Sequence, residues 1–307
     1  MPQEPLSQSN LSRWQRWVLA SRPKTLTAAA TPVLVGCAIA YSHGQFQLPE
    51  ALAALLVAFS IQIGTNLHND VSDYQRGTDR EDRLGPLRVT QAGLLTPEEV
   101  RLGAFLCFGL ASLAGLFLVL QAGIVVLGMG VASILAALSY SAGPSPLSEN
   151  GLADVFVLLF FGFVAVCGTV YVQMQRIPTE TWLASAAVGG TITALLVVNN
   201  VRDIESDRLS GRRTIPVVYG RRVGILEYQV LLAVAYAVPV LMFVWKFSNA
   251  WVLIPLLTLP LAVRWSWFLL QHKGRILNRC LGGTAQLIFL HGYAMALGIV
   301  LGAGFPL

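Results

Sequence analysis

Two short motifs rich in asparagine and aspartate interrupt an otherwise apolar sequence, and each follows a long apolar segment. The first reads NLHNDVSD at 66–73, and the second, at an offset of 130 positions, reads NNVRD at 199–203 with Asp207 after it. Carboxylate and amide oxygens suit a hard divalent cation such as Mg²⁺, which takes one or two protein carboxylates and completes its shell with water and phosphate oxygens. The motifs therefore predict Mg²⁺ bound together with a phosphorylated substrate.

Helical geometry places the polar side chains of each motif on one face. At 100° per residue, the first set falls within about 100° and the second steps along a single face. We expect two facing stripes that hold Mg²⁺ on both sides of one diphosphate. The expected metal ligands are Asn66, Asn69, Asp70, Asp73, Asn199, Asp203 and Asp207, and the four aspartates among them are also expected to be catalytic.

Basic residues near the motifs supply the remaining charge that a diphosphate needs. Arginine pairs with phosphate through two parallel hydrogen bonds, and lysine acts as a point charge. The expected diphosphate-binding residues are Arg22, Lys24, Arg83, Arg88, Arg202 and Arg212. As an alternative, the aspartates form salt bridges with these same arginines and only close the helix ends. The recurrence of the motif favours the metal site.

Several other chemistries lack their motifs in this sequence. It contains no GxxxxGK[ST] phosphate loop, no Gly-x-Ser-x-Gly nucleophile turn and no HExxH zinc motif. The four cysteines stand singly in apolar stretches and are interpreted as packing residues: Cys37, Cys107, Cys167 and Cys280.

The elements that must position the motifs are membrane helices. Hydrophobic residues make up 55% of the 307 residues, charged residues 12%, and the mean hydropathy is +0.63. A soluble domain carries about 25% charged residues, so we expect an all-α integral membrane protein. Its apolar segments are long enough to cross a bilayer. They fall at about 27–42, 50–69, 101–120, 122–140, 153–173, 183–200, 224–246, 250–270 and 280–303, which gives nine spans.

The distribution of basic residues predicts the topology. All of the 21 Lys and Arg except Arg176, Lys246 and Arg264 fall in the N-terminal segment or in alternate connections. Cytoplasmic loops are enriched in Lys and Arg, so the N-terminus is expected inside and the C-terminus outside. The two motifs then lie at the cytoplasmic ends of helices 2 and 6. Basic loops that only fix topology and contact anionic lipid remain an alternative.

These motifs together resemble the UbiA superfamily of intramembrane prenyltransferases. The segments that carry the resemblance are RPKTL at 22–26, NLHND at 66–70, GPLR at 85–88, FFG at 160–162 and NNVRD at 199–203. Their order and spacing are most similar to the members that prenylate 1,4-dihydroxy-2-naphthoate. The resemblance covers most of residues 22–220 and is weaker after that.

The resemblance implies a Mg²⁺-dependent transfer of a polyprenyl group from polyprenyl diphosphate to 1,4-dihydroxy-2-naphthoate, with loss of CO₂, to give demethylmenaquinone. It implies an active site on the cytoplasmic face of the inner or plasma membrane. Residues 1–21 are expected to form an interfacial segment and residues 22–307 a single transmembrane prenyltransferase domain. Membrane lipid is an expected partner and nucleic acid is not, and the oligomeric state is left open.

Carried over by position, Asn69 and Asp73 match the first metal motif of the superfamily, and Asp203 and Asp207 match the second. Many members continue the first motif with another acid four residues later, where this sequence has Gly77. Asp79, displaced by two positions, is therefore a doubtful ligand.

Two further residues are expected to be catalytic. Tyr140 could face the allylic cation with its π surface or act as an interfacial anchor. Asp154, where the family has an active-site acid, could orient the aromatic substrate or cap its helix.

Two other functions remain as alternatives. One is a prenyltransferase of the same superfamily with another aromatic acceptor, such as 4-hydroxybenzoate or homogentisate. The other is a secondary transporter, whose site would lie near the bilayer midplane and not at helix ends.

Overall fold

The computed structural model describes residues 11–77, 84–85, 87–143 and 146–304, and within these ranges the regular structure is entirely helical. The helices are α1 Arg13–Ser21, α2 Pro23–Ser42, α3 Leu48–Gln75, α4 Pro97–Ala122, α5 Ile124–Ser141, α6 Ala153–Val157, α7 Ala165–Met174, α8 Thr179–Arg202, α9 Ile204–Leu209, α10 Ile215–Tyr219, α11 Arg221–Val244, α12 Leu259–Gln271 and α13 Leu277–Gly304. A π-helical segment, Leu158–Val164, joins α6 to α7. Short 3₁₀ segments, Leu147–Glu149, Ala250–Thr258 and Gly274–Ile276, precede α6, α12 and α13.

The prediction of nine membrane spans is confirmed. Within the described part of the chain, nine helical stretches are long and apolar enough to cross a bilayer. The shortest separation lies between α4 and α5, where Gly123 alone joins the two helices. It adopts φ 87°, a conformation that glycine reaches without the steric cost of a Cβ atom.

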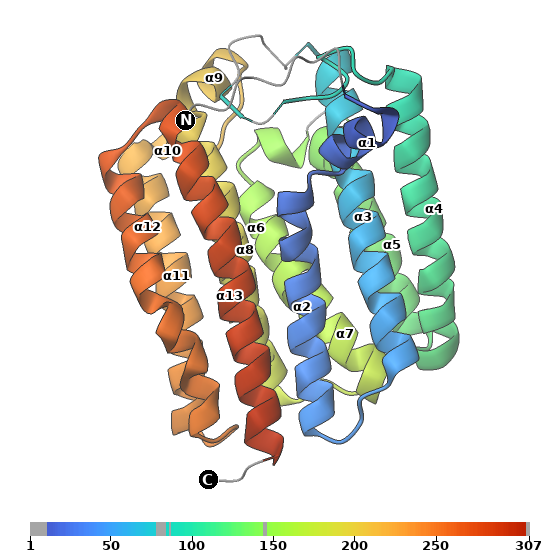
Figure 1. Cartoon of the computed structure of the whole chain (residues 1–307), viewed down its shortest axis with the longest axis vertical. Coiled ribbons are helices and arrows are strands. Elements are labelled where there is room, and N and C mark those ends of the chain that lie inside the picture. The colour runs from blue at the N-terminus through green and yellow to red at the C-terminus, as the bar shows by residue number, and fades with distance from the viewer. Residues whose placement is uncertain (1–10, 78–83, 86, 144–145, 305–307) are drawn as a thin grey trace.

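Both motif-bearing helices end at the same end of the bundle. Figure 1 shows α1, α9 and α10 gathered at this end, shown at the top, with the C-terminus at the opposite end. The first motif occupies the last turns of α3, and the second spans the end of α8 and the start of α9. Which side of the membrane this end faces stays a prediction.

The helices pack in neighbouring pairs and expose apolar side chains on the outside of the bundle. α3 packs on α4, α8 on α11 and α2 on α13. Leu102, Phe105 and Leu113 of α4 are among its exposed large side chains, as expected where lipid replaces water as the solvent. α8 meets the π-helical segment at Gly162 and Gly189, where a Cβ on either glycine would come within 3 Å of the other backbone. This close approach explains the glycine in the FFG segment.

The junction between α1 and α2 places Arg22 beside the first motif. Arg22 takes a left-handed conformation, φ 51° and ψ 69°, and Pro23 opens α2 with its fixed φ. The chain turns here, so α1 packs on α3. Trp14 of α1 is 75% exposed, whereas Trp17 is half-buried in a cluster with Leu67. This sidedness agrees with an interfacial helix, which stays a prediction.

Candidate active site

A cavity of about 480 Å³ opens among the helices at the motif end and extends into the bundle. Its polar lining comes from both motifs and from nearby arginines. These residues are Arg22, Asn66, Asn69, Asp73, Arg88, Asn199, Asn200, Arg202, Asp203, Asp207 and Arg212. Six of the seven expected metal ligands and four of the six expected diphosphate-binding residues thus share one space.

The rest of the cavity is an apolar channel. It is lined by Val33, Ala54, Leu118, Val126, Met129 and Val172, among others. Ala54 and Asp73 both lie on α3, so the lining extends roughly 28 Å along the bundle at 1.5 Å per residue. Gly115 and Gly130 line this channel. A Cβ atom added at either glycine would meet no atom within 4 Å, so the space beside them is open. An elongated apolar group fits this channel, with its charged end at the motifs.

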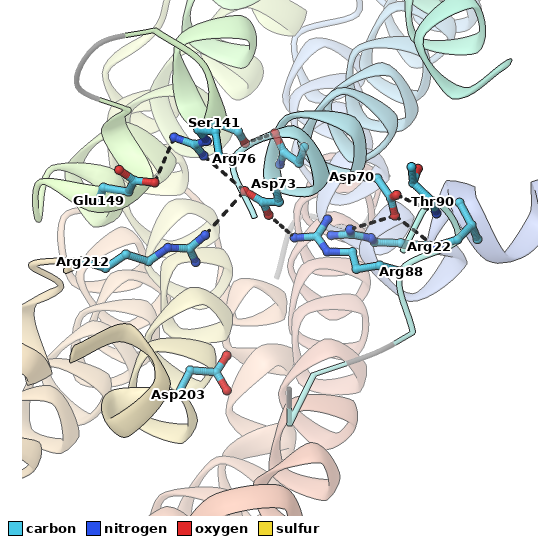
Figure 2. A network of polar contacts seen from close by, with 12 residues as sticks. Arg22, Asp70, Asp73, Arg76, Arg88, Thr90, Ser141, Glu149, Asp203 and Arg212 are labelled. Carbon is cyan, nitrogen blue, oxygen red and sulfur yellow. Dashed lines mark hydrogen bonds and ion pairs between the residues drawn. The ribbon is translucent and has the colours of Figure 1, made fainter. Parts of the chain in front are cut away.

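Asp73 is the centre of the polar network in Figure 2. Its carboxylate accepts hydrogen bonds from Arg88 at 2.5 Å, from Arg76 at 3.2 Å and from Arg212 at 3.4 Å. Arg76 also pairs with Glu149 at 2.9 Å. The carboxylate of Asp73 thus joins arginines from three parts of the chain at the wall of the cavity.

Arg212 joins the two motifs. It contacts Asp73 of the first at 3.4 Å and Asp207 of the second at 3.7 Å. Burial alone would lower the pKa of this guanidinium, but the carboxylates of Asp73, Asp207 and Glu149 outweigh burial and raise the pKa above its usual value. Arg212 is therefore a permanent cation between the motifs.

The second motif does not lie on a straight helix, and the expectation of one continuous helical face was wrong. α8 ends at Arg202, Asp203 has φ −98° and ψ 11°, and α9 restarts at Ile204. Asn199, Asp203 and Asp207 nevertheless all line the cavity. Figure 2 shows the Asp203 carboxylate apart from the Asp73 network and on another part of the bundle.

Arg202 fixes the position of Asp203. Its guanidinium binds both carboxylate oxygens of Asp203, at 2.8 and 2.5 Å. It also donates to Asn278 of α13 at 2.8 Å, and Asn278 in turn donates to the backbone oxygen of Leu84 at 2.9 Å. The connection after α3 is thus tied to the second motif through α13.

Asp70 has a different environment from that expected for a catalytic metal ligand. It is buried but does not line the cavity. Its two carboxylate oxygens accept the backbone N–H groups of Val89 and Thr90, at 3.2 and 3.0 Å, and Arg22 lies 3.9 Å away. These contacts favour a structural role in holding the segment that carries Arg88.

One expected diphosphate-binding residue lies away from the cavity. Lys24 is exposed on the first turn of α2 and does not line the cavity. Arg83 and the doubtful Asp79 lie outside the described residues.

The asparagines of the first motif hold neighbouring helices together while facing the cavity. Asn66 donates from Nδ2 to the Ser21 carbonyl at 3.0 Å and to the Thr25 hydroxyl at 2.9 Å. The Oδ1 atom of Asn69 accepts a hydrogen bond from Ser141 of α5. An amide oxygen has two lone pairs, so this contact leaves Asn69 with acceptor capacity for a cation.

Tyr140 lines the cavity, whereas Asp154 is buried behind the lining. The carboxylate of Asp154, in the first turn of α6, accepts a hydrogen bond from Asn200 of α8. Both expected roles of Asp154 stay predictions.

Sequence reasoning missed several residues of the network. Arg76 follows Asp73 by three positions on α3, so helical spacing could have found it. Ser141 and Glu149 come from other segments, and only the tertiary structure brings them to the motifs. Thr25 and Asn200 lie in segments that the sequence singled out, but their contacts also depend on tertiary structure.

The donor chemistry fits Mg²⁺ that is shared with a substrate. In the part of the chain described, no group of three or more His, Cys, Asp or Glu is arranged to hold a metal by itself. Mg²⁺ does not need such a group, because it binds through one or two carboxylates plus phosphate oxygens. Asp73 on one side and Asp203 and Asp207 on the other supply these carboxylates around one cavity.

Comparison with known proteins supports this architecture. The chain is 35% identical over 306 residues to the 1,4-dihydroxy-2-naphthoate octaprenyltransferase of Escherichia coli. The alignment covers 96% of this chain and 98% of the relative. It is 38% identical over 255 residues to the enzyme of the same name from Mycobacterium tuberculosis, covering 83% and 86%.

Solved structures share the fold. A UbiA homologue from Aeropyrum pernix aligns with a TM-score of 0.71 at 15% identity, over 89% of this chain and 98% of that one. A UbiA homologue from Archaeoglobus fulgidus bound to GPP and Mg²⁺ aligns with a TM-score of 0.63 at 16% identity, over 92% and 99%.

A family model described as the UbiA prenyltransferase family matches residues 29–302, nearly the whole described chain. The nine spans, the paired motifs and this match lead to one conclusion: the chain is an integral membrane protein that belongs to the UbiA prenyltransferase family.

Proposed function

We propose that the protein transfers a polyprenyl group from polyprenyl diphosphate to 1,4-dihydroxy-2-naphthoate in a Mg²⁺-dependent reaction, with loss of CO₂, and so forms demethylmenaquinol, the two-electron-reduced form of demethylmenaquinone. The observation that carries this proposal is the full-length similarity to naphthoate octaprenyltransferases. The cavity agrees with it, because two carboxylate motifs and several arginines stand at the mouth of an apolar channel.

The residues at the mouth bind the diphosphate. Arg88 and Arg212 have side chains that can pair with phosphate oxygens, and Arg22 lines the same space. Asp73, Asp203 and Asp207 would hold Mg²⁺, with Asn69 and Asn199 beside them. When bound, the metal supplies Lewis-acid stabilisation of the departing diphosphate.

The channel and its walls hold the two organic partners. The prenyl tail extends along Val33, Met129 and Val172 and so leaves the allylic carbon near the motifs. As the C–O bond to the diphosphate breaks, the positive charge on the allylic group faces Tyr140, whose ring can stabilise a cation. The aromatic ring then forms the new C–C bond, and its carboxylate leaves as CO₂.

The membrane orientation follows from charge. The motif end carries most of the basic residues, so we place it on the cytoplasmic side of the inner or plasma membrane, with the N-terminus inside. Residues 1–21 would lie at the membrane interface, and residues 22–307 would form one prenyltransferase domain.

The proposal is tested with the purified protein in proteoliposomes. Dihydroxynaphthoate and 4-hydroxybenzoate are each supplied with a panel of prenyl diphosphates, with Mg²⁺ or with a chelator, and lipid products are identified by mass. We expect prenylated naphthoquinone only with dihydroxynaphthoate and only with Mg²⁺. Prenylated hydroxybenzoate in its place, or a yield that the chelator leaves unchanged, would contradict the proposal.

A further inference from the structure

The cavity wall contains a buried polar pair that the diphosphate site does not use: Asn200 of α8 and Asp154 of α6. Asn200 is 7% exposed and lines the cavity, and Asp154, 4% exposed, lies behind it. Nδ2 of Asn200 donates to both carboxylate oxygens of Asp154, at 3.2 and 3.4 Å. A carboxylate only accepts hydrogen bonds, so this contact determines which way the amide of Asn200 points.

The orientation leaves an acceptor atom directed away from Asp154. With Nδ2 turned to the carboxylate, Oδ1 of Asn200 occupies the other side of the amide. Within the described part of the chain, the hydrogen bonds of the Asn200 side chain are those of Nδ2. Oδ1 is not one of the sealed, unpartnered side-chain atoms, so it is accessible from the cavity. Polar groups in protein interiors generally have a hydrogen-bond partner, so Oδ1 is suited to a donor on a ligand in the cavity.

The position of the pair matches the place of the aromatic acceptor. Asn200 lies on α8 three residues before Asp203, which puts it about one turn deeper in the bundle than the Asp203 carboxylate. Tyr140 and Phe156 line the same cavity. A ring bound against Asn200 would therefore lie next to the reacting allylic carbon.

We propose that Asn200 binds a hydroxyl group of the aromatic acceptor through Oδ1, and that Asp154 is the positioning residue that holds the amide in this orientation. The inference rests on the proposed function, because it assigns the acceptor's place in that reaction. The hydrogen bond from Nδ2 to a carboxylate polarises the amide and strengthens Oδ1 as an acceptor. A hydroxyl that donates to Oδ1 keeps more electron density on the ring, which favours attack on the allylic cation.

Initial-rate kinetics with Asn200→Ala and the nearly isosteric Asn200→Leu test the contact. One hydrogen bond is worth about 0.5–1.5 kcal/mol, so the KM for the acceptor should rise about 3- to 10-fold. The KM for prenyl diphosphate should stay unchanged. Gln229→Ala is the matched control, because this amide bonds Ser266 between α11 and α12 at 3.1 Å and does not line the cavity. It should leave both KM values unchanged.

A double-mutant cycle separates positioning from general stability. Asp154→Leu should raise the acceptor KM, and Asp154→Asn, which keeps one acceptor oxygen, should recover most of the loss. In the Asn200→Ala background, Asp154→Leu should add no further rise, because the two residues act through one contact. Additive losses, or a rise in the KM for prenyl diphosphate in place of the acceptor, would overturn the inference.

Competitive inhibition by a hydroxynaphthoate and by its methyl ether tests whether the hydroxyl group itself is recognised, in the wild type and in Asn200→Leu. The wild type should bind the hydroxyl compound about 3- to 10-fold more tightly, and Asn200→Leu should lose this preference. Equal binding of the two compounds by the wild type would overturn the inference. Absence of any prenylated product with the wild type would instead contradict the proposed function.

Discussion

Replacement of Asp73 by alanine is expected to lower prenyl transfer by at least about 100-fold, since loss of one preorganised charged group at a reacting centre costs roughly 10²–10³. It is also expected to destabilise the protein. Only 6% of the Asp73 side chain and 6% of the Arg88 side chain are exposed, so the variant breaks a buried ion pair. Such a loss is worth about 3–5 kcal/mol. Turnover in proteoliposomes and the apparent melting temperature in detergent measure the two effects separately.

Two controls distinguish chemistry from packing. Asp73→Asn keeps the volume and one oxygen, so it should recover part of the melting temperature but little of the turnover. Asp70→Asn should lower the melting temperature, because Asp70 holds Val89 and Thr90, yet leave the half-saturating Mg²⁺ concentration unchanged. Wild-type turnover in Asp73→Ala, or a raised Mg²⁺ requirement in Asp70→Asn, would contradict these roles.

Asp203→Ala is expected to lose turnover to the same extent, with a smaller fall in melting temperature than Asp73→Ala. Its side chain is 20% exposed, and its partner Arg202 retains the hydrogen bond to Asn278. Solvent reaches this carboxylate more readily than Asp73, so its removal leaves a smaller desolvation cost. The same two measurements apply. A large fall in melting temperature with turnover retained would make Asp203 a structural residue.

Much of the fold could be predicted from the sequence, because membrane spans depend on local composition. A run of about 20 apolar residues in a bilayer forms a helix whichever helices pack against it. The lipid offers no hydrogen-bond partners, so the backbone N–H and C=O groups must pair within the segment. The nine spans and the placement of both motifs at one end of the bundle follow from this rule.

The roles of residues within the motifs could not be predicted as well. A stripe about 100° wide is broad enough for its two edges to face different neighbours. Asn69, on one edge, meets Ser141 of α5, and Asp70, on the other, meets the backbone after Arg88. The break in the helix at Asp203 also has no proline or glycine to mark it.

Long-range contacts of the site could not be predicted from local sequence patterns. Glu149 pairs with Arg76, and its backbone oxygen accepts the N–H of Arg213, so it connects segments that are far apart in the sequence. Asn200 was part of a motif, but its contact with Asp154 depends on how α6 packs against α8.

The central claim is that both motifs bind one Mg²⁺–diphosphate unit from opposite sides of the cavity. It is tested most directly by binding of a non-hydrolysable prenyl diphosphate analogue to the purified protein, titrated with Mg²⁺ in the wild type, Asp73→Asn and Asp203→Asn. We expect tight binding that requires Mg²⁺ in the wild type and is weakened in both variants. Binding that is independent of Mg²⁺, or that is unaffected by loss of either carboxylate, would contradict the claim.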